Sequence, residues 1–161
     1  EEEEGAMYDL AEELLEKDGY EHYEISNYAR PKMECRHNMG YWKRRDYLGF
    51  GLGASTLLNP VRYKNTDSLS DYLSMDFSKK EFMVLTKDNQ IEETMFLGLR
   101  VLSGVSMTKF QEIFACPMKI VYGRELDRLM ARGMVEEKSD YIRLTEKGIA
   151  LSNQVLAEFL L

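Results

Sequence analysis

The stretch that decides the fold is MVEEKSDYIRLT, residues 134–145. Its two ends, Met134–Glu136 and Tyr141–Leu144, flank the polar residues 138–140, which is typical of two short strands joined by a turn. Thr145 follows at the place where a hydroxyl side chain caps a helix, here one that runs to Leu161. The stretch therefore predicts a two-stranded wing followed by a C-terminal helix.

Three helices are predicted in front of this wing. The third covers 118–131 and is closed by Gly133, because glycine readily adopts the left-handed conformation that ends a helix. The second covers 106–114. The first is indicated by an apolar stripe at helical spacing, which ends at Ser103-Gly104 and consists of Ile91, Met95, Phe96, Leu99 and Leu102. Three helices, a wing and a last helix are typical of a winged-helix-like domain.

The composition changes near Asp88, so we place a domain boundary between residues 80 and 88. Upstream of it, residues 1–18 form an amphipathic pattern with Met7, Leu10, Ala11, Leu14 and Leu15 at helical spacing. Residues 20–25 alternate like a strand. A helix followed by a strand is half of a repeating β–α unit, so the chain is expected to begin within a domain.

The segment between this strand and the boundary carries the chemically richest residues. Residues 26–46 predict an irregular but ordered functional loop, because they are rich in aromatic and ring-nitrogen side chains. Residues 47–57 alternate apolar side chains with glycine, which indicates a buried strand that another group approaches closely. A short strand at 61–65, a helix from Asp67 or Ser68 to Met75 and an extended segment at 82–86 complete the expected elements.

Composition and charge exclude several classes of protein. The 161 residues are 44% hydrophobic and 30% charged, which indicates a folded chain, and no apolar run is long enough to span a membrane. The first four residues are glutamates, unlike a signal peptide, so a cytoplasmic location is expected. The net charge is −7, and only residues 35–80 are basic. That segment is either solvated surface or the contact of an anionic small molecule.

Several candidate site residues stand out, each with more than one interpretation. His37 is a heme or metal ligand, a proton donor or a structural hydrogen-bonding group. The glycines at 49, 51 and 53 allow a ligand to approach the backbone, or they serve tight packing. Residues 43–45, Lys-Arg-Arg, are a solvated patch or a partner for propionates or phosphate. Cys116-Pro117 is similar to short heme-contact motifs, although a helix boundary before Pro117 explains it as well. Cys35 and Cys116 are too few to hold zinc or an iron–sulfur cluster.

Three quoted segments carry a family resemblance: GYEHYEISNYARP (19–31), RHNMGYW (36–42) and YLGFGLGA (47–54). They resemble the C-terminal part of the oxygen-independent coproporphyrinogen III oxidase-like proteins of the radical S-adenosylmethionine (SAM) superfamily. The His-Asn-x-x-Tyr-Trp pattern resembles the HemW-like heme chaperone branch. The resemblance is weaker but consistent over 90–161.

The resemblance implies an α+β fold, with the last β–α elements of a partial TIM-like barrel over 1–85 and a winged-helix-like domain over 86–161. It implies heme contact by His37, with His37 a possible ligand of the heme iron, and by Asn38, Tyr41 and Trp42. It implies contact with SAM in the parent protein by Gly53, Ala54 and Ser55. The parent would hold heme, SAM and a [4Fe-4S] cluster, and would pass heme to an acceptor protein.

This chain departs from the family pattern in one respect. The Cys-x-x-x-Cys-x-x-Cys motif that binds the catalytic cluster is absent from residues 1–161. The resemblance therefore implies a fragment that holds no cofactor by itself and has no catalytic activity of its own.

Two alternative functions stay open at this stage. The first is coproporphyrinogen III oxidase itself, which decarboxylates two propionates oxidatively, although the His-Asn-x-x-Tyr-Trp pattern favours the chaperone. The second is a winged-helix module that binds nucleic acid. Residues 118–147 carry seven basic and six acidic side chains, a weak electrostatic attraction for phosphates, so no nucleic-acid partner is expected.

Overall fold

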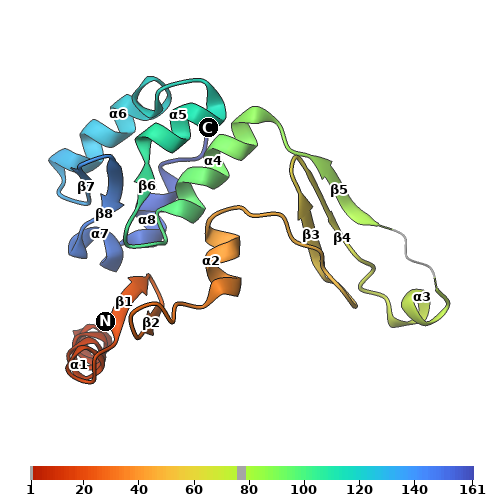
Figure 1. The fold of residues 1–161 in the computed structure, drawn as a ribbon, viewed down its shortest axis with the longest axis horizontal. Coiled ribbons are helices and arrows are strands. Elements are labelled where there is room, and N and C mark those ends of the chain that lie inside the picture. Colours follow the sequence, from red (N-terminus) through yellow and green to blue (C-terminus); the bar gives the residue numbers. More distant parts are fainter. Residues whose placement is uncertain (1, 76–78) are drawn as a thin grey trace.

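The main cluster of buried side chains lies between Ile91 and Phe159, in the C-terminal half of the chain. The computed structural model describes residues 2–75 and 79–161. Figure 1 shows the C-terminal half as a rounded body, with the N-terminal helix below it and a β-ribbon projecting to one side. This is an α+β arrangement, as the sequence predicts.

The C-terminal half combines helices with a three-stranded antiparallel sheet in the order β6-β8-β7. Val105 pairs with Ile142, and Val135 pairs with Leu144. The predicted wing is thus the β7–β8 pair, and β6, which the sequence did not predict, adds a third strand. The elements are α4 (Lys87–Gly98), β6 (Val105–Ser106), α5 (Met107–Phe114), α6 (Met118–Ala131), β7 (Val135–Lys138), β8 (Tyr141–Leu144), α7 (Glu146–Ala150) and α8 (Ser152–Ala157).

Side-chain caps begin three of these helices. Thr86 and Asn89 form a reciprocal capping box at α4, the Ser106 hydroxyl accepts from the Lys109 amide, and Thr145 accepts from Gly148. The prediction of one continuous helix from Thr145 to Leu161 is wrong, because the structure has two helices there, α7 and α8. Leu151 leaves the helical conformation and separates α7 from α8, and beyond this break Val155 and Phe159 are fully buried.

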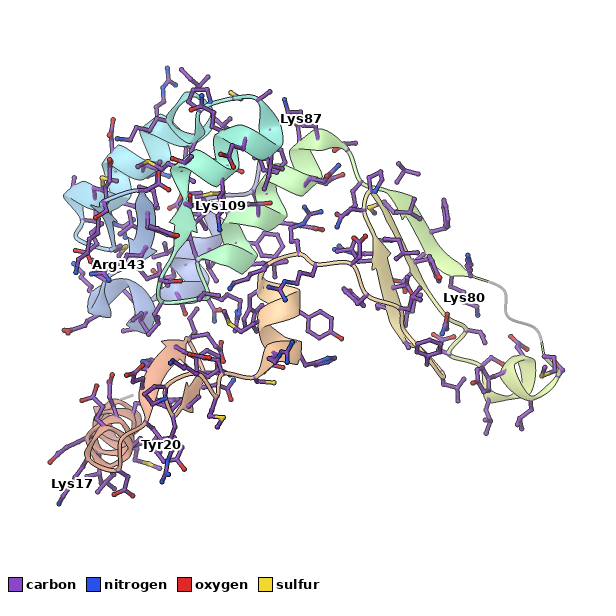
Figure 2. All side chains as sticks on the ribbon, in the orientation of Figure 1. Lys17, Tyr20, Lys80, Lys87, Lys109 and Arg143 are labelled. Atoms are coloured by element: carbon purple, nitrogen blue, oxygen red, sulfur yellow. The ribbon has the colours of Figure 1, made fainter. Side chains whose placement is uncertain are left out.

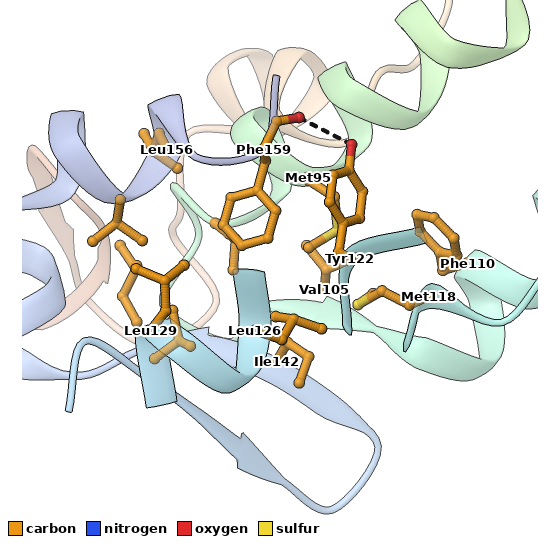
Figure 3. Close-up of a cluster of buried hydrophobic side chains, with 14 of the residues drawn as sticks. Met95, Val105, Phe110, Met118, Tyr122, Leu126, Leu129, Ile142, Leu156 and Phe159 are labelled. Carbon is orange, nitrogen blue, oxygen red and sulfur yellow. Dashed lines mark hydrogen bonds between the residues drawn. The ribbon is translucent and has the colours of Figure 1, made fainter. Parts of the chain in front are cut away.

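A buried hydrogen bond in the core joins α6 to the C-terminal segment. The Tyr122 hydroxyl donates to the Phe159 carbonyl at 2.9 Å, and the two rings meet edge to face (Figure 3). Burial raises the pKa of Tyr122 far above its ordinary value of 10.0. The phenol therefore stays protonated and ties α6 to the C-terminal segment.

The N-terminal segment is a helix followed by a hairpin. α1 (Glu2–Lys17) agrees with the predicted helix, whose first residue lies outside the described part. Its apolar side chains are largely exposed, with Met7 at 72% and Leu10 at 56%. The predicted strand at 20–25 is β1 (Glu21–Glu24), which turns back into the antiparallel partner β2 (Asn27–Ala29).

The projecting ribbon consists of β3 (Ser55–Leu58), β4 (Val61–Lys64) and β5 (Lys80–Val84), antiparallel in that order, with α3 (Leu69–Leu73) between β4 and β5. Its outer strand β5 is exposed throughout, and Figure 2 shows side chains reaching into solvent from this ribbon, Lys80 among them. All the described strand pairs are antiparallel. The parallel pairing of a barrel therefore does not occur within the described residues.

Asp140 is expected to make folding sensitive to acid. Its carboxylate accepts hydrogen bonds from the Ser106 and Thr108 hydroxyls and from the Thr108 amide, which tie the wing turn to the start of α5. These bonds lower the pKa of Asp140 below its ordinary 3.8. Their stabilisation is complete above the unfolded-state pKa and is lost as the pH falls through the lower folded-state value.

We expect the free energy of unfolding of the unmodified protein to fall as the pH is lowered from neutral to below 3.8. The fall should be smaller in Asp140→Asn. Urea unfolding at each pH measures both. Asp127→Asn on the exposed face of α6 is the control. Identical acid dependence in all three proteins would refute a role for Asp140.

Candidate functional site

The predicted heme-contact motif lies on a short helix. Residues 26–46 were predicted as an irregular loop, and this is wrong in part, because the segment contains β2 and the seven-residue helix α2 (Arg36–Trp42). A helix turns about 100° per residue, so side chains four positions apart share a face. His37 and Tyr41 therefore lie on one face of α2, and Asn38 and Trp42 lie on a second face about 100° around the helix.

The His37 face is open to solvent. The exposed His37 ring meets the Tyr41 ring edge-on, with 4.7 Å between centroids, and Tyr41 meets Tyr47 in the same way. No side chain within the described ranges hydrogen-bonds a nitrogen of the His37 ring. An imidazole lone pair is thus available to a metal ion.

The space beside Gly40 is open. Gly40 lies one turn from His37 in the helix, and a methyl group built on it would meet no atom within 4 Å.

On the second face, Trp42 contacts the C-terminal half of the chain. The guanidinium carbon of Arg100 stands 4.6 Å from the centroid of the Trp42 ring. The indole Nε1 of Trp42 is buried and has no hydrogen-bond partner among the described residues. Trp42 was predicted to offer its ring to a porphyrin, and in the structure Arg100 covers one face of that ring.

A small cavity opens behind Tyr41. Its volume is about 210 Å³, and it is lined by Tyr41, Tyr47, Leu57, Arg62, Glu93, Phe96 and Leu97. Ligand pockets usually measure about 300–1,000 Å³. The cavity is therefore too small to enclose a porphyrin, and a macrocycle bound through His37 would lie on the open side of α2.

A buried ion cluster forms one wall of this cavity. The Glu93 carboxylate pairs with Arg44 at 2.9 Å and with Arg62 at 2.6 Å and 3.0 Å, in the two-pronged geometry that guanidinium favours. Arg44 also donates to the Asn59 side chain. Of the three cationic residues predicted to reach propionates, Arg44 is thus engaged internally, whereas Lys43 and Arg45 are exposed.

Glu93 and Arg100 were both missed by sequence reasoning. The partners of Glu93 lie 31 and 49 positions away, so no local pattern marks it. The only local signal was an acidic residue close to the apolar stripe of a predicted helix.

The glycine-rich segment does not form the predicted buried strand. Only Ser55–Leu58 is a strand, and before it Gly51 and Gly53 adopt left-handed conformations. The close neighbour of Gly49 is the chain itself, since an added Cβ would lie 2.2 Å from the Ser55 carbonyl oxygen. The tight-packing interpretation of this glycine is therefore the one that the structure favours.

The predicted SAM contacts lie apart from the predicted heme contacts. The Gly53 amide donates to the Thr66 carbonyl, and the Ala54 carbonyl accepts from the Asn65 amide, while the side chain of Ser55 is exposed. Within the described part of the chain, no hydrogen bond or ring contact joins residues 53–55 to residues 37–42. The structure does not bring the two predicted sets together.

Cysteine and basic residues add no further site. Cys35 and Cys116 are unpaired, and the described ranges hold no group of three or more His, Cys, Asp or Glu side chains placed for a metal ion. Over 118–147, Lys119, Arg128 and Arg143 each pair with a glutamate, which weakens the basic face that nucleic acid requires. Among the described helices, none has the length and apolar character needed to cross a membrane.

The sequence of the chain is similar to that of several known proteins. Residues 85–151 match the HemN C-terminal domain. The chain is 41% identical to the heme chaperone HemW of Lactococcus lactis over 157 residues, covering 96% of this chain and 41% of that protein. It is 34% identical to HemW of Bacillus subtilis, covering 99% and 43%. The chain thus spans about two fifths of the length of these relatives.

The fold also matches a solved structure. The Escherichia coli coproporphyrinogen III oxidase HemN, described as a radical SAM enzyme, superposes with a TM-score of 0.74 at 17% identity, over 95% of this chain and 40% of that one. The chain is therefore similar over nearly its whole length to part of the heme chaperone HemW, and over residues 85–151 to the HemN C-terminal domain.

Proposed function

We propose that this chain is the heme-contacting part of a HemW-like heme chaperone and that His37 binds the heme iron. The observation that carries the proposal is the exposed His37 ring, whose nitrogens have no hydrogen-bond partner among the described residues. Bound heme would supply an iron centre with an open coordination position for imidazole. Tyr41 supports the His37 ring from the side, and Gly40 leaves room for a flat ligand.

The surrounding charges support the same proposal. Lys43 and Arg45 are exposed just beyond the end of α2, so their charges are available to the propionate groups of a heme. Asn38 and Trp42 complete the proposed heme-contact motif from the neighbouring face of α2, where Trp42 also contacts Arg100. A heme-acceptor protein is the expected partner of the whole protein.

The arrangement of domains is part of this proposal. Residues 1–85 would supply the last elements of a radical SAM barrel, and residues 86–161 would form a winged-helix-like domain. The exposed apolar face of α1 and the match to two fifths of a HemN-type fold support this division.

The residues present do not fit a [4Fe-4S] cluster. Such a cluster needs about four thiolates. Cys35 and Cys116 are the two cysteines of the chain, and they begin separate parts of the fold, at α2 and before α6. We assign no cluster chemistry to these residues, and contact with SAM by Gly53, Ala54 and Ser55 is kept as a proposal for the parent protein.

Hemin titration of the full chain tests the assignment of His37. We expect hemin to shift its Soret band on binding and to quench the emission of Trp42, the single tryptophan of the chain. His37→Ala should weaken binding at least about tenfold, because it removes the iron ligand. The melting temperature should change little, since the His37 side chain is exposed and its ring contact is with Tyr41.

His22→Gln is the matched control, because His22 is the other histidine and stacks on Tyr28 in the hairpin. Unchanged hemin affinity with a markedly lower melting temperature for His37→Ala would show a structural clasp and remove His37 from the site.

Metal-free protoporphyrin IX separates the chaperone from the oxidase alternative. A site built around an iron ligand loses hemin affinity in His37→Ala but keeps its affinity for the metal-free ring. Equal losses for both ligands would favour a porphyrin-substrate site, as coproporphyrinogen III oxidase requires.

A further inference from the structure

Helix α2, which carries His37, has no fully buried side chain that would hold it in place. None of the seven residues of α2 is fully buried. A seven-residue helix is too short to be stable by itself in water. Something outside α2 must therefore fix the direction in which His37 points.

The connection between α4 and β6 provides a rigid attachment beside α2. Its Leu99 is 0% exposed and its Val101 is 6% exposed. Its backbone is also bonded to the β1–β2 hairpin at positions 100 and 102. The Ile25 amide donates to the Arg100 carbonyl at 3.0 Å, and the Leu102 amide donates to the Tyr23 carbonyl at 3.1 Å. The backbone of Arg100 is thus held by the core and by the hairpin together.

Tyr23 also reaches the start of α2. Its hydroxyl accepts from the amide of Cys35, the N-cap residue, at 3.3 Å. The first and last turns of α2 are therefore both tied to the same structural unit, the first through Tyr23 and the last through Arg100.

The Arg100 side chain is committed to Trp42. The guanidinium carbon lies 4.6 Å from the indole centroid, and Arg100 Nε is buried without a hydrogen-bond partner among the described residues. No ion pair of Arg100 with a described carboxylate occurs. Among the described residues, the interaction of this partly buried cation is the cation–π contact with the face of the Trp42 ring.

We propose that Arg100 is a positioning residue for the heme site, which sets the orientation of His37 through Trp42. His37 and Trp42 belong to the same seven-residue helix, so a displacement of Trp42 turns the helix and moves His37 with it. The proposal rests on the heme-binding function proposed above. It gives the C-terminal half of the chain a direct part in ligand binding.

The single tryptophan provides a readout of this contact that needs no heme. Arg100→Met keeps the length and apolar stem of the side chain but removes the cation, so we expect a shift in the emission maximum of Trp42. Arg100→Lys keeps a cation over the ring and should stay close to the unmodified protein. Arg124→Met on the exposed part of α6 is the matched control, with no shift expected.

Hemin titration then measures the effect on ligand binding. We expect Arg100→Met to lower hemin affinity at least about fivefold and to change the Soret band of the complex, because iron ligation depends on the direction of the imidazole. Arg100→Lys should restore both. Circular dichroism melts of each variant show whether the fold persists, and Arg100→Gln replaces Arg100→Met if the latter is unfolded.

Each outcome decides between the two proposals. If hemin binds the unmodified protein and His37→Ala abolishes binding, but Arg100→Met and Arg100→Gln bind hemin normally, the positioning role is refuted and the heme site stands. If Arg100→Met weakens binding and Arg100→Lys does not restore it, the contact with Trp42 is not the cause and the positioning role is again refuted. If the unmodified protein binds no hemin, the heme site fails, and the role of Arg100 fails with it.

Discussion

Replacing Glu93 with alanine is expected to lower the free energy of unfolding by about 3–5 kcal/mol, because removing one member of a buried ion cluster leaves the others unpaired. The side chains of Glu93 and Arg44 are each only 9% exposed. The Glu93 carboxylate is the acidic partner of both Arg44 and Arg62. Without it, both guanidinium groups lose their acidic partner, Arg44 at a largely buried position and Arg62 at one that is 35% exposed.

Urea unfolding measures this loss, with Glu112→Ala on the exposed face of α5 as the control, expected to stay within about 0.5 kcal/mol of the unmodified protein. Arg44→Ala should cost less than Glu93→Ala, since Arg62 still pairs with Glu93 through both oxygens. A loss below about 1 kcal/mol in Glu93→Ala would show that the cluster is solvated and contributes little.

This cluster joins three parts of the molecule that carry the proposed site. Arg44 follows α2, Arg62 belongs to β4 and Glu93 belongs to α4. The cavity behind Tyr41 has Arg62 and Glu93 in its wall. Helix α2 is therefore fixed from two directions, by the Glu93 cluster beyond its C-terminal end and by Arg100 over Trp42.

The sequence predicts the C-terminal half well because the signals there are local. The bounds of α6 agree with the predicted 118–131, and the strand signals around residues 138–140 correctly give the β7–β8 wing. The hydroxyl caps at Ser106 and Thr145 act within three residues of their own positions. Apolar spacing and helix caps depend on residues close together in the sequence. The packing of the core then stabilises the same helices and strands.

The N-terminal half is predicted less well because tertiary contacts decide it. Helix α2 contains His, Asn, Gly, Tyr and Trp, which are weak helix formers, so no propensity signal marks it. The alternation of glycine and apolar residues over 47–57 fits a strand and a series of turns equally well. The turns occur because Gly51 and Gly53 adopt conformations that other residues rarely reach.

The candidate site shows the same division. The motif residues His37, Asn38, Tyr41 and Trp42 are found from the sequence, but their separation onto two faces follows only once α2 is known to be a helix. Arg100 and Glu93 act through partners that are distant in the sequence. No spacing rule predicts such partners.

Gly104→Ala is expected to lower the free energy of unfolding by about 2–5 kcal/mol, since two separate costs add. Gly104 has φ +80, in the left-handed region where an L side chain costs about 1–2 kcal/mol. A Cβ at this position would also lie 2.1 Å from the Ile142 carbonyl oxygen and 2.7 Å from the Arg143 Cβ. Overpacking of this kind typically costs about 1–3 kcal/mol.

The same substitution at Gly123 isolates this effect. Gly123 lies in α6, its φ is not positive, and an added Cβ would meet nothing within 4 Å. Gly123→Ala should therefore leave stability unchanged or raise it by up to about 1 kcal/mol, because alanine favours helix more than glycine does. Thermal and urea unfolding should thus show a loss of stability in Gly104→Ala and no loss in Gly123→Ala.

Gly104 is the last residue of the connection between α4 and β6, which also contains Arg100. A small loss in Gly104→Ala would therefore mean that this connection yields easily. A connection that yields could not hold Arg100 over Trp42, so this stability measurement also bears on the proposed positioning of His37.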